Sequence, residues 1–382
     1  MSNSSDFIHQ FLVKHPNDLI FLENIRGLRA KSAEFSQAAF HDIFQAPSTL
    51  LSPALKYFLA ARIANASGNV GLAAHYTAQS EFADLPETAP WWHVLLDYVD
   101  TLTLEPQHTQ RQQLQDLQQA GWAVADIVLL AQLSSFVAFQ VRLIQGLSIL
   151  LDHHTSSEPP SDLTAIRAHD WNHHSTTSTG QTGVTDFTQE VLGWEAWLRP
   201  RDLDQLSVAE QAVLDRYGLL QKGSAYFLLL SHQLDILEKR TVIDRDIFYS
   251  QGGLEKWLRE FSAVISSKVN GCIYCASVHA RKASIYAKAH ADDVQRLLDT
   301  PAGQVLANST YSEKLQQIIE FNAALATTPI QLNASHVQGL RQFGFSDQEL
   351  LDFIQATAFF AWANRLMLSL GEPFHLPETV VA

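Results

Sequence analysis

The sequence predicts an all-α protein, and its periodicity supports this class. Apolar residues recur three or four positions apart along most of the chain, which is the spacing of a buried helix face. Runs that alternate polar and apolar residues, as half-buried strands do, are absent. The helical pattern is clearest in four segments: 111–119, where Leu114 and Leu117 lie on an otherwise polar helix, 208–217, 254–269 and 313–326.

Composition limits the organisation and the partners of the protein. With 382 residues, 46% of them hydrophobic, the chain is long enough for two domains. The formal net charge of −14 and the lack of basic runs disfavour binding to nucleic acid or to an anionic membrane. The N-terminus does not follow the pattern of a signal peptide, and apolar stretches such as 127–133 end well short of a membrane span. We therefore expect a cytoplasmic protein.

The segment 152–186 differs from the rest of the chain because Ser, Thr, His, Pro and Gly dominate it. This composition predicts a polar linker between two domains. Its histidines raise the question of a metal site, but a solvated tract is the simpler interpretation for a stretch of this kind. These histidines are His153, His154, His169, His173 and His174.

An internal repeat supports a division into two domains. The segment 121–147 aligns with 344–370 at a constant offset of 223, without a gap. The paired residues include an arginine within an apolar segment and several apolar or aromatic positions. They are Gly121 with Gly344, Gln132 with Gln355, Phe136 with Phe359, Ala138 with Ala361, Arg142 with Arg365, and Leu147 with Leu370.

A second match aligns 61–75 with 265–279, and it keeps a histidine but changes the chemistry around it. In this register His75 pairs with His279, Gly68 with Cys272, Gly71 with Cys275, and Lys56 with Glu260. We therefore expect a helical domain over 1–151, a linker over 152–186 and a related helical domain over 187–382. The first domain is expected to be a degenerate copy that lacks the reactive groups of the second.

The two cysteines, Cys272 and Cys275, are the only ones in the chain. In a reducing cytosol so close a pair is more often catalytic or metal-binding than structural. The helix before them is expected to end near Asn270 and Gly271, so that Cys272 opens the next helix. There the unpaired N–H groups and the helix dipole favour a thiolate. The two thiols are close enough on a first turn to form a disulfide.

Two further side chains complete the candidate site. His279 lies four residues after Cys275 on the same helix face, so its imidazole is within reach of that thiol. Glu260, from the preceding helix, is expected to take a proton from this pair, directly or through water. A thiol beside a base is the arrangement that activates a cysteine nucleophile.

Zinc is the main alternative for these four side chains. Two thiolates, an imidazole and a carboxylate are ligand types that zinc accepts, but no second CxxC accompanies them. A third interpretation is a pair of merely buried cysteines, although chance rarely places the only thiols of a chain three apart beside a histidine. The pattern favours redox chemistry without a metal, and with no cofactor other than a Cys272–Cys275 disulfide.

The order Glu–x11–Cys–x2–Cys–x3–His, with Asn-Gly before the first cysteine, carries a family resemblance. It resembles the AhpD-like alkylhydroperoxidases of the carboxymuconolactone decarboxylase superfamily. The later segment AFFAWANRLMLSLGEP, at 358–373, is similar to the closing helix of that superfamily, which carries an Asn-Arg pair. The resemblance covers most of 194–373 and implies two fused AhpD-like domains, the first of them degenerate.

The resemblance also implies roles for the site residues. Cys275 would be the peroxidatic thiol, Cys272 the resolving thiol, and Glu260 with His279 the proton relay that activates Cys275. Local electrostatics alone favours Cys272 as the attacking thiol, because it lies nearer the helix N-terminus. The chain departs from the best-known family pattern at Tyr274, where that pattern has a second histidine, so a shorter relay or a tyrosine hydrogen-bond donor is expected here.

Other polar residues near the repeat are expected to be structural. Arg142 occupies the position of Arg365 in the half without cysteines, so a buried ion pair or a helix-capping role is favoured over catalysis for Arg365 and its neighbour Asn364. His75 is interpreted as a packed remnant of the repeat. Lys268, which precedes the cysteine motif, is expected on a solvated helix face.

The combined prediction is a thiol peroxidase or disulfide reductase. A peroxide would oxidise Cys275 to a sulfenic acid, Cys272 would condense with it, and an external thiol or dithiol donor would reduce the disulfide. Two other functions stay open: a lactone decarboxylase-type enzyme of the same superfamily, and a non-enzymatic thiol switch or scaffold. The resemblance further implies a homo-oligomer, either a trimer or a dimer.

Overall fold

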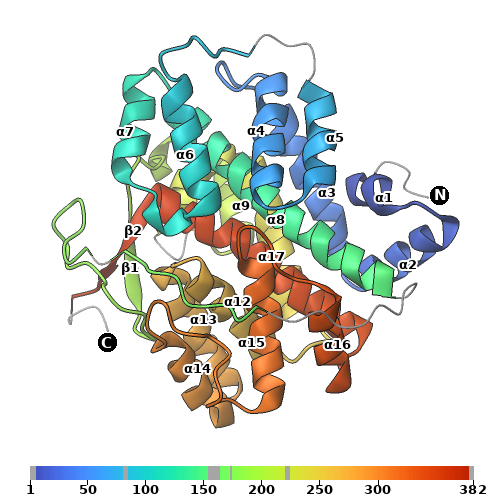
Figure 1. Ribbon diagram of the computed structural model, residues 1–382. Coiled ribbons are helices and arrows are strands. Elements are labelled where there is room, and N and C mark those ends of the chain that lie inside the picture. Colours follow the sequence, from blue (N-terminus) through green and yellow to red (C-terminus); the bar gives the residue numbers. More distant parts are fainter. Residues whose placement is uncertain (1–5, 81–84, 154–163, 173, 220–223, 378–382) are drawn as a thin grey trace.

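The computed structural model describes residues 6–80, 85–153, 164–172, 174–219 and 224–377, without the side chain of residue 153, and shows an all-α protein (Figure 1). Two of the four clearest expected helices, α7 (Arg111–Gln119) and α15 (Glu313–Ala326), have the expected bounds. The other two, α9 (Val208–Arg216) and α12 (Lys256–Val269), differ by one or two residues. The remaining α-helices are α1 (Phe7–Leu12), α2 (Pro16–Gly27), α3 (Ala30–Gln45), α4 (Pro53–Ala66), α5 (Val70–Ser80), α6 (Trp92–Leu104), α8 (Val124–His153), α10 (Ala225–Leu230), α11 (Leu234–Tyr249), α13 (Ile273–Tyr286), α14 (Ala291–Leu298), α16 (Ala334–Gln342) and α17 (Asp347–Leu370).

A short antiparallel strand pair departs from the helical pattern. β1 (Leu192–Ala196) pairs with β2 (Gly371–His375), which begins directly after α17. The strands approach closely at Gly371, where an added Cβ would lie only 2.1 Å from the carbonyl oxygen of Glu195. The absence of a side chain on this glycine permits the approach. Strands of five residues, only partly buried, show too little alternation for sequence periodicity to reveal them.

The long helices α8 and α17 pack against each other through the middle of the molecule (Figure 1). They approach closely at Gly146, where a Cβ would lie 2.6 Å from Cγ2 of Ile354. The Trp362 indole N–H donates to the side-chain oxygen of Gln132 at 2.9 Å, which ties the two helices together. α8 is long and apolar enough to cross a membrane, but its apolar window is entirely buried inside the protein. It therefore has the environment of a core helix.

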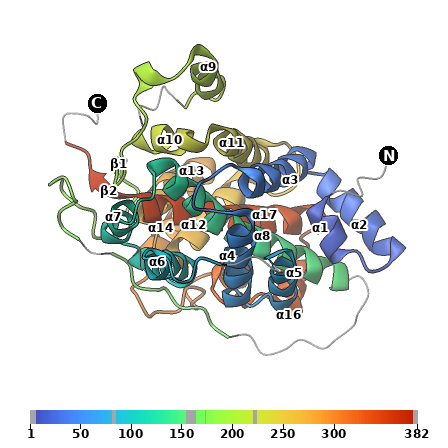
Figure 2. The same ribbon diagram turned by 90° about the horizontal axis from the view of Figure 1, so that it is seen from above.

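The helices of the first half of the chain (1–151) have counterparts in the second half (187–382), in nearly the same register as the sequence repeat. α3 and α11 have equal lengths, and both of their ends coincide in the register of the second sequence match. α7 and α16 coincide at both ends in the register of the first match, in which α8 and α17 also begin together. α4 and α12 have equal lengths and lie a single position out of the second register. Equivalent helices also pack on each other, α3 on α11 and α8 on α17 (Figure 2). The division of the chain into domains at 151 and 187 stays a prediction.

Arg142 of α8 and Arg365 of α17 occupy equivalent positions of the repeat. Each of them binds the end of a helix in the other half. Arg142 Nη2 donates to the carbonyl oxygens of Ala326 and Thr327, each at 2.9 Å, at the end of α15. Arg365 Nη2 donates to the carbonyl oxygen of Thr103 at 2.9 Å, in the last turn of α6. Both arginines are buried, which lowers their pKa, to about 10 for Arg365. The helix-capping role expected for Arg365 is confirmed.

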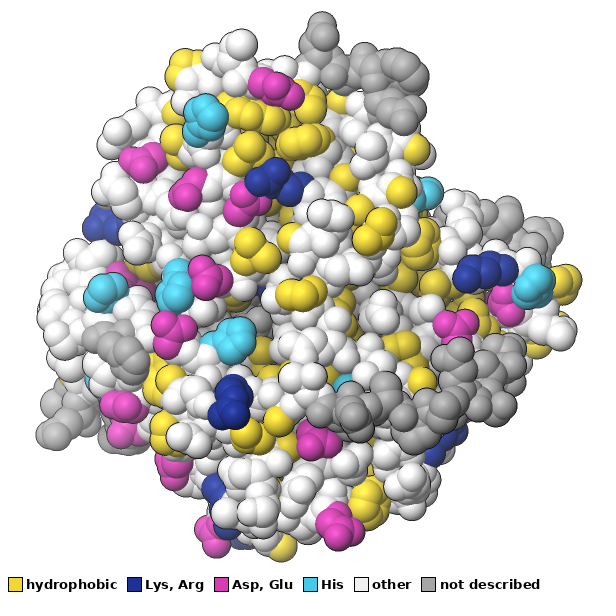
Figure 3. Space-filling model, in the orientation of Figure 1, with side chains coloured by type: hydrophobic (Ala, Val, Ile, Leu, Met, Phe, Trp, Pro, Cys, Tyr) yellow, Lys and Arg dark blue, Asp and Glu magenta, His cyan; other side chains and the backbone are white. Residues whose placement is uncertain are grey.

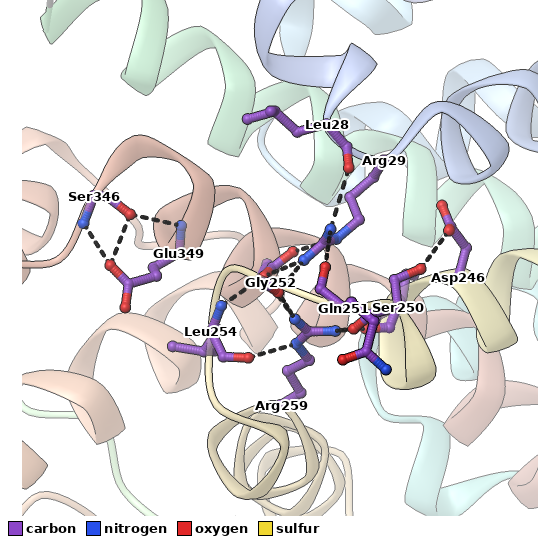
Figure 4. Close-up of polar contacts among 12 residues, drawn as sticks. Leu28, Arg29, Asp246, Ser250, Gln251, Gly252, Leu254, Arg259, Ser346 and Glu349 are labelled. Carbon is purple, nitrogen blue, oxygen red and sulfur yellow. Dashed lines mark hydrogen bonds and ion pairs between the residues drawn. The ribbon is translucent and has the colours of Figure 1, made fainter.

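A buried ion-pair network fixes the helix that precedes the cysteine motif (Figure 4). Arg29, between α2 and α3, donates to both carboxylate oxygens of Asp352 on α17 at 2.8 Å. Arg259 of α12 lies 3.3 Å from the same carboxylate. Arg259 also donates to the carbonyl oxygens of Ile247 and Ser250 at the end of α11, at 3.0 and 2.9 Å. The network therefore joins α11, α12 and α17 to the N-terminal helices.

The described part of the expected linker, 164–172 and 174–186, packs against the second half. Its backbone at Ala168 is hydrogen-bonded to Gln304 and Gly303, each at 2.8 Å. Ile166, Ala168 and Val184 are buried, so this part is attached to the core and not only solvated. Five histidines are considered for a metal site. His154, His173 and the side chain of His153 lie outside the described residues. The other two, His169 and His174, are exposed.

Lys268 holds this segment in place. Its ammonium nitrogen lies 4.2 Å from the centre of the Trp171 ring and 3.9 Å from the centre of the Phe187 ring. It also donates to the carbonyl oxygen of Leu298 at 2.7 Å, at the end of α14. The expectation that Lys268 lies on a solvated face is wrong, because its side chain is completely buried.

Charged side chains are dispersed on the face of the molecule shown in Figure 3. Lys and Arg side chains lie singly there, among acidic and apolar ones, and do not gather into a basic patch. The whole chain carries 26 Lys and Arg against 40 Asp and Glu. The chain as a whole therefore carries a net negative charge of −14.

Candidate functional site

The cysteine motif lies at a tight junction between α12 and α13. α12 ends at Val269 with Asn270 as its C-cap, and Gly271 follows with a φ of +73°. Glycine is favoured there because this left-handed conformation strains other residues. A Cβ on Gly271 would also lie only 2.6 Å from the Cβ of Gln107. The expected end of the first helix is confirmed, and the glycine is required both by conformation and by space.

Both thiols lie at the beginning of α13, as the sequence predicts. Cys272 is the N-cap residue, and Cys275 lies within the first turn. The thiols are free and buried, with Cys272 1% and Cys275 6% exposed. Burial raises the pKa of Cys272 well above its ordinary value, and the adjoining Cys275 raises it further. At Cys272, burial therefore outweighs the favourable effect of the helix N-terminus.

Asn364 of α17 completes the surroundings of the Cys272 thiol. Although burial dominates the raised pKa of Cys272, a hydrogen bond with Asn364 acts in the opposite direction. The Asn364 amide nitrogen donates to Oγ of Ser267 at 3.0 Å, and its oxygen accepts from Nδ2 of Asn270 at 3.1 Å. The sequence pattern predicts a structural role for Asn364, like that of its neighbour Arg365. Only the packing of α17 against α12 brings it to the thiol, so no local pattern could have identified it.

Glu260 and His279 are in direct contact, as expected. The Nδ1 atom of His279 is hydrogen-bonded to Oε2 of Glu260, whose side chain is buried on α12. Lys282 places its ammonium nitrogen 3.8 Å from the other carboxylate oxygen, Oε1. Two basic groups thus face one buried carboxylate, which offsets the cost of burying its charge. Because Nδ1 is engaged by Glu260, Nε2 is the ring nitrogen left for proton transfer.

Aromatic rings enclose the histidine. Phe360 of α17 packs edge-on against His279 with ring centres 4.5 Å apart, and Phe248 of α11 lies 5.5 Å away. Within the described residues, His279 makes no direct hydrogen bond to Cys275. Proton transfer between the imidazole and this thiol therefore needs a bridging water or a small movement of the ring.

A surface pocket opens at the N-terminus of α13. It lies between the α12–α13 junction, the β1–β2 pair and the described linker segment, and Cys272 forms part of its wall. The lining is largely apolar and aromatic, with a few polar side chains. Its apolar members include Trp194, Trp197, Tyr274, Met367 and Pro373, and its polar members include Gln107, Asn172 and Glu372.

The equivalent positions of the first half hold structural groups. Lys56 of α4 is buried and donates to the carbonyl oxygens of Ile43 at 3.0 Å and Ala46 at 2.5 Å, at the end of α3. Burial lowers the pKa of Lys56 to about 8. His75 packs edge-on against Phe7 with ring centres 5.1 Å apart, in an aromatic cluster. These contacts explain both residues as packing and capping groups.

Metal ligands are not grouped in the part of the chain that the structure describes. There, no set of three or more His, Cys, Asp and Glu side chains lies in a position to hold a metal ion. The chain matches no protein-family model and no curated protein. A functional proposal for it therefore depends on the geometry of the site.

Proposed function

We propose that the protein is a thiol-dependent hydroperoxide reductase with AhpD-like chemistry, in which Cys272 and Cys275 alternate between dithiol and disulfide. One observation carries this proposal. The only two thiols of the chain occupy the N-cap and the first turn of one helix, next to a histidine paired with a buried glutamate. This arrangement supports a redox function because it combines a disulfide-forming pair with a proton acceptor.

The proposed cycle has three balanced steps. The Cys275 thiolate attacks the outer oxygen of a hydroperoxide, so that an S–O bond forms, the O–O bond breaks, and the alkoxide takes a proton and leaves as an alcohol. The thiol of Cys272 then attacks the sulfenic sulfur of Cys275, which forms the disulfide and releases water. An external thiol donor supplies two electrons, restores the dithiol and leaves as its own disulfide.

The environment of Cys272 supports Cys275 as the attacking thiol. Burial and the adjoining thiol raise the pKa of Cys272, so its sulfur stays protonated while Cys275 reacts. A protonated thiol suits the resolving role, which begins only after the sulfenic acid has formed. His279 and Glu260 then serve Cys275, taking the thiol proton and returning one to the leaving alkoxide.

Trapping the oxidised thiol tests this proposal. After one equivalent of cumene hydroperoxide, the parent protein should contain an intramolecular disulfide. Cys272→Ser should hold a sulfenic acid on Cys275 that dimedone labels, and Cys275→Ser should form neither product. Peptide mass spectrometry distinguishes these outcomes. A dimedone label on Cys272 would reverse the order of attack, and resistance of both thiols to cumene hydroperoxide and hydrogen peroxide would refute the proposed function.

A further inference from the structure

Arg240 of α11 is a buried arginine that the proposed thiol cycle does not use. It is 7% exposed, and its Nε is fully buried without a hydrogen-bond partner. Within the described residues it forms no hydrogen bond and no ion pair, not even with Asp244 one turn further along the helix. Its guanidinium instead lies over aromatic rings, 4.9 Å from the centre of Phe359 and 6.0 Å from that of Tyr226. A buried cation without a counter-ion is costly, so a ligand that brings negative charge would stabilise this position.

Tyr226 of α10 presents a second unused donor beside this arginine. Its hydroxyl is buried and, among the described residues, has no hydrogen-bond partner. Burial raises the pKa of Tyr226, and although Arg240 acts in the opposite direction, the phenol keeps its proton. A guanidinium and a protonated phenol are both hydrogen-bond donors, and together they suit an anionic acceptor.

Tyr226 lies close to the thiol end of the candidate site. Its ring packs edge-on against Trp194 with ring centres 5.3 Å apart. Trp194 in turn lines the surface pocket that contains Cys272. After burial and Arg240, the charges of Cys275 and Cys272 are the next influences on the pKa of Tyr226, which agrees with this placement.

Arg240 is also connected to the histidine end of the site. Phe359, beneath the guanidinium, adjoins Phe360 with ring centres 6.1 Å apart. Phe360 packs on His279 at 4.5 Å. Aromatic rings therefore surround the unpaired donors and join them to both parts of the redox site, and they favour an apolar body in a bound molecule.

The first half of the molecule provides a contrast. Ser36 occupies the position equivalent to Arg240, and there it lines a small hollow together with Phe136 and Arg26. Arg26 is paired with Asp6 at 2.6 Å, so its charge is neutralised within the chain. The second half places an arginine at this position of the repeat, and no acid among the described residues forms an ion pair with it.

We propose that Arg240 and Tyr226 bind the carboxylate of an anionic organic hydroperoxide beside Cys275, a substrate class that rests on the proposed function. A single guanidinium offers two parallel N–H donors, which match a carboxylate and balance its one charge. The aromatic rings contact the organic part of the substrate. The peroxide group then reaches Cys275, while the carboxylate stays on the arginine.

A matched pair of substrates tests this site. One is the tertiary hydroperoxide derived from 4-isopropylbenzoic acid, which carries a free carboxylate, and the other is the methyl ester of the same hydroperoxide. The parent protein should prefer the acid, and Arg240→Gln should raise the KM for the acid about 10- to 100-fold, since a charged hydrogen bond is lost, without changing the KM for the ester. Arg240→Lys should restore part of the preference. Arg245→Gln, on the same helix but exposed, should behave as the parent.

A binding measurement separates this proposal from the proposed function. We expect 4-isopropylbenzoate to raise the melting temperature of the parent and of Arg245→Gln, but not of Arg240→Gln. If the parent reduces neither hydroperoxide but shows this arginine-dependent shift, the carboxylate site stands and the peroxidase function fails. Two results would overturn the site. One is a ratio of the KM values for acid and ester that is the same in the parent and in Arg240→Gln. The other is a melting-temperature shift with 4-isopropylbenzoate that is absent or that does not depend on Arg240.

Discussion

At the scale of single residues, the candidate site depends on a few side chains that different helices hold in fixed positions. Gly271 permits the junction that places Cys272 at the N-cap of α13. Glu260, buried on α12, orients His279 through its Nδ1 atom. The pKa of the buried Cys272 thiol is raised, so in the proposed cycle the motif relies on the Glu260–His279 pair to move protons.

Replacing Glu260 by glutamine tests this dependence. Glu260→Gln keeps the size of the side chain but removes the carboxylate that holds His279 through its Nδ1 atom. We expect kcat/KM for cumene hydroperoxide to fall by about 10²-fold or more, because general acid–base catalysis contributes on that order. Steady-state kinetics measures the effect, with circular dichroism to show that the fold persists. Glu313→Gln, at an exposed position of α15, is the control, and equal loss in both variants would contradict the role of Glu260.

At the scale of secondary-structure elements, close helix packing determines where the site residues lie. α17 brings Asn364 to Cys272 and Phe360 to His279, and α8 supports α17 along its length. α8 and α17 are in close contact at Gly146, which lies against Ile354. The position of the candidate site residues therefore depends on a helix pair to which both halves contribute.

Gly146→Ala tests how tightly α8 and α17 pack. A Cβ at this position would lie 2.6 to 3.0 Å from three side-chain atoms of Ile354, so the helices or the side chain must move. We expect the free energy of unfolding to fall by about 1–3 kcal/mol, as overpacked cores do. Gly27→Ala is the matched control, because no atom lies within 4 Å of its added Cβ. Urea denaturation measures both, and a Gly146→Ala protein as stable as the control would show that the helices are not tightly packed.

Lys268 connects α12, α14 and the linker segment, and its titration predicts a pH effect on stability. Burial lowers its pKa from 10.5 in the unfolded chain to about 7 in the folded protein. Between these values the unfolded chain binds one more proton, so stability rises with pH above 7. The steepest slope is about 1.4 kcal/mol per pH unit.

A comparison of variants isolates the contribution of Lys268 to this slope. We expect the free energy of unfolding to rise less between pH 7 and pH 9 in Lys268→Met than in the parent protein. Lys31→Met, which changes an exposed lysine, should retain the parental slope. Chemical denaturation at both pH values gives the slopes. The same rise in Lys268→Met and in the parent would show that this lysine keeps its charge when folded, stabilised by the rings of Trp171 and Phe187.

At the scale of the whole molecule, the halves are joined by contacts that cross between them. Arg142 binds the end of α15 and Arg365 binds the end of α6, while Arg29 reaches Asp352 on α17. Because each half supplies donors to the other, the candidate site residues of the second half depend on packing against the first. Only the second half combines thiols with a Glu–His pair, so one redox centre per chain is proposed.

Local patterns were sufficient to predict the helical class, the α12–α13 junction and the pairing of Glu260 with His279. Each depends on residues close in sequence or on adjacent helices. The features that could not be predicted include the β1–β2 pair, the burial of Lys268, the contact of Asn364 with Cys272, and the lack of an ion-pair partner for Arg240 among the described residues. These arise from contacts between distant segments, for which a single sequence gives no periodic signal.

The central claim is that Cys272 and Cys275 form a catalytic redox pair. Steady-state consumption of cumene hydroperoxide, with dithiothreitol as the electron donor, tests it most directly when the parent and Cys275→Ser proteins are compared. We expect repeated turnover by the parent and a loss of about 10³-fold or more in Cys275→Ser, since the proposed nucleophile is gone. Undiminished consumption of the hydroperoxide by Cys275→Ser would contradict the claim.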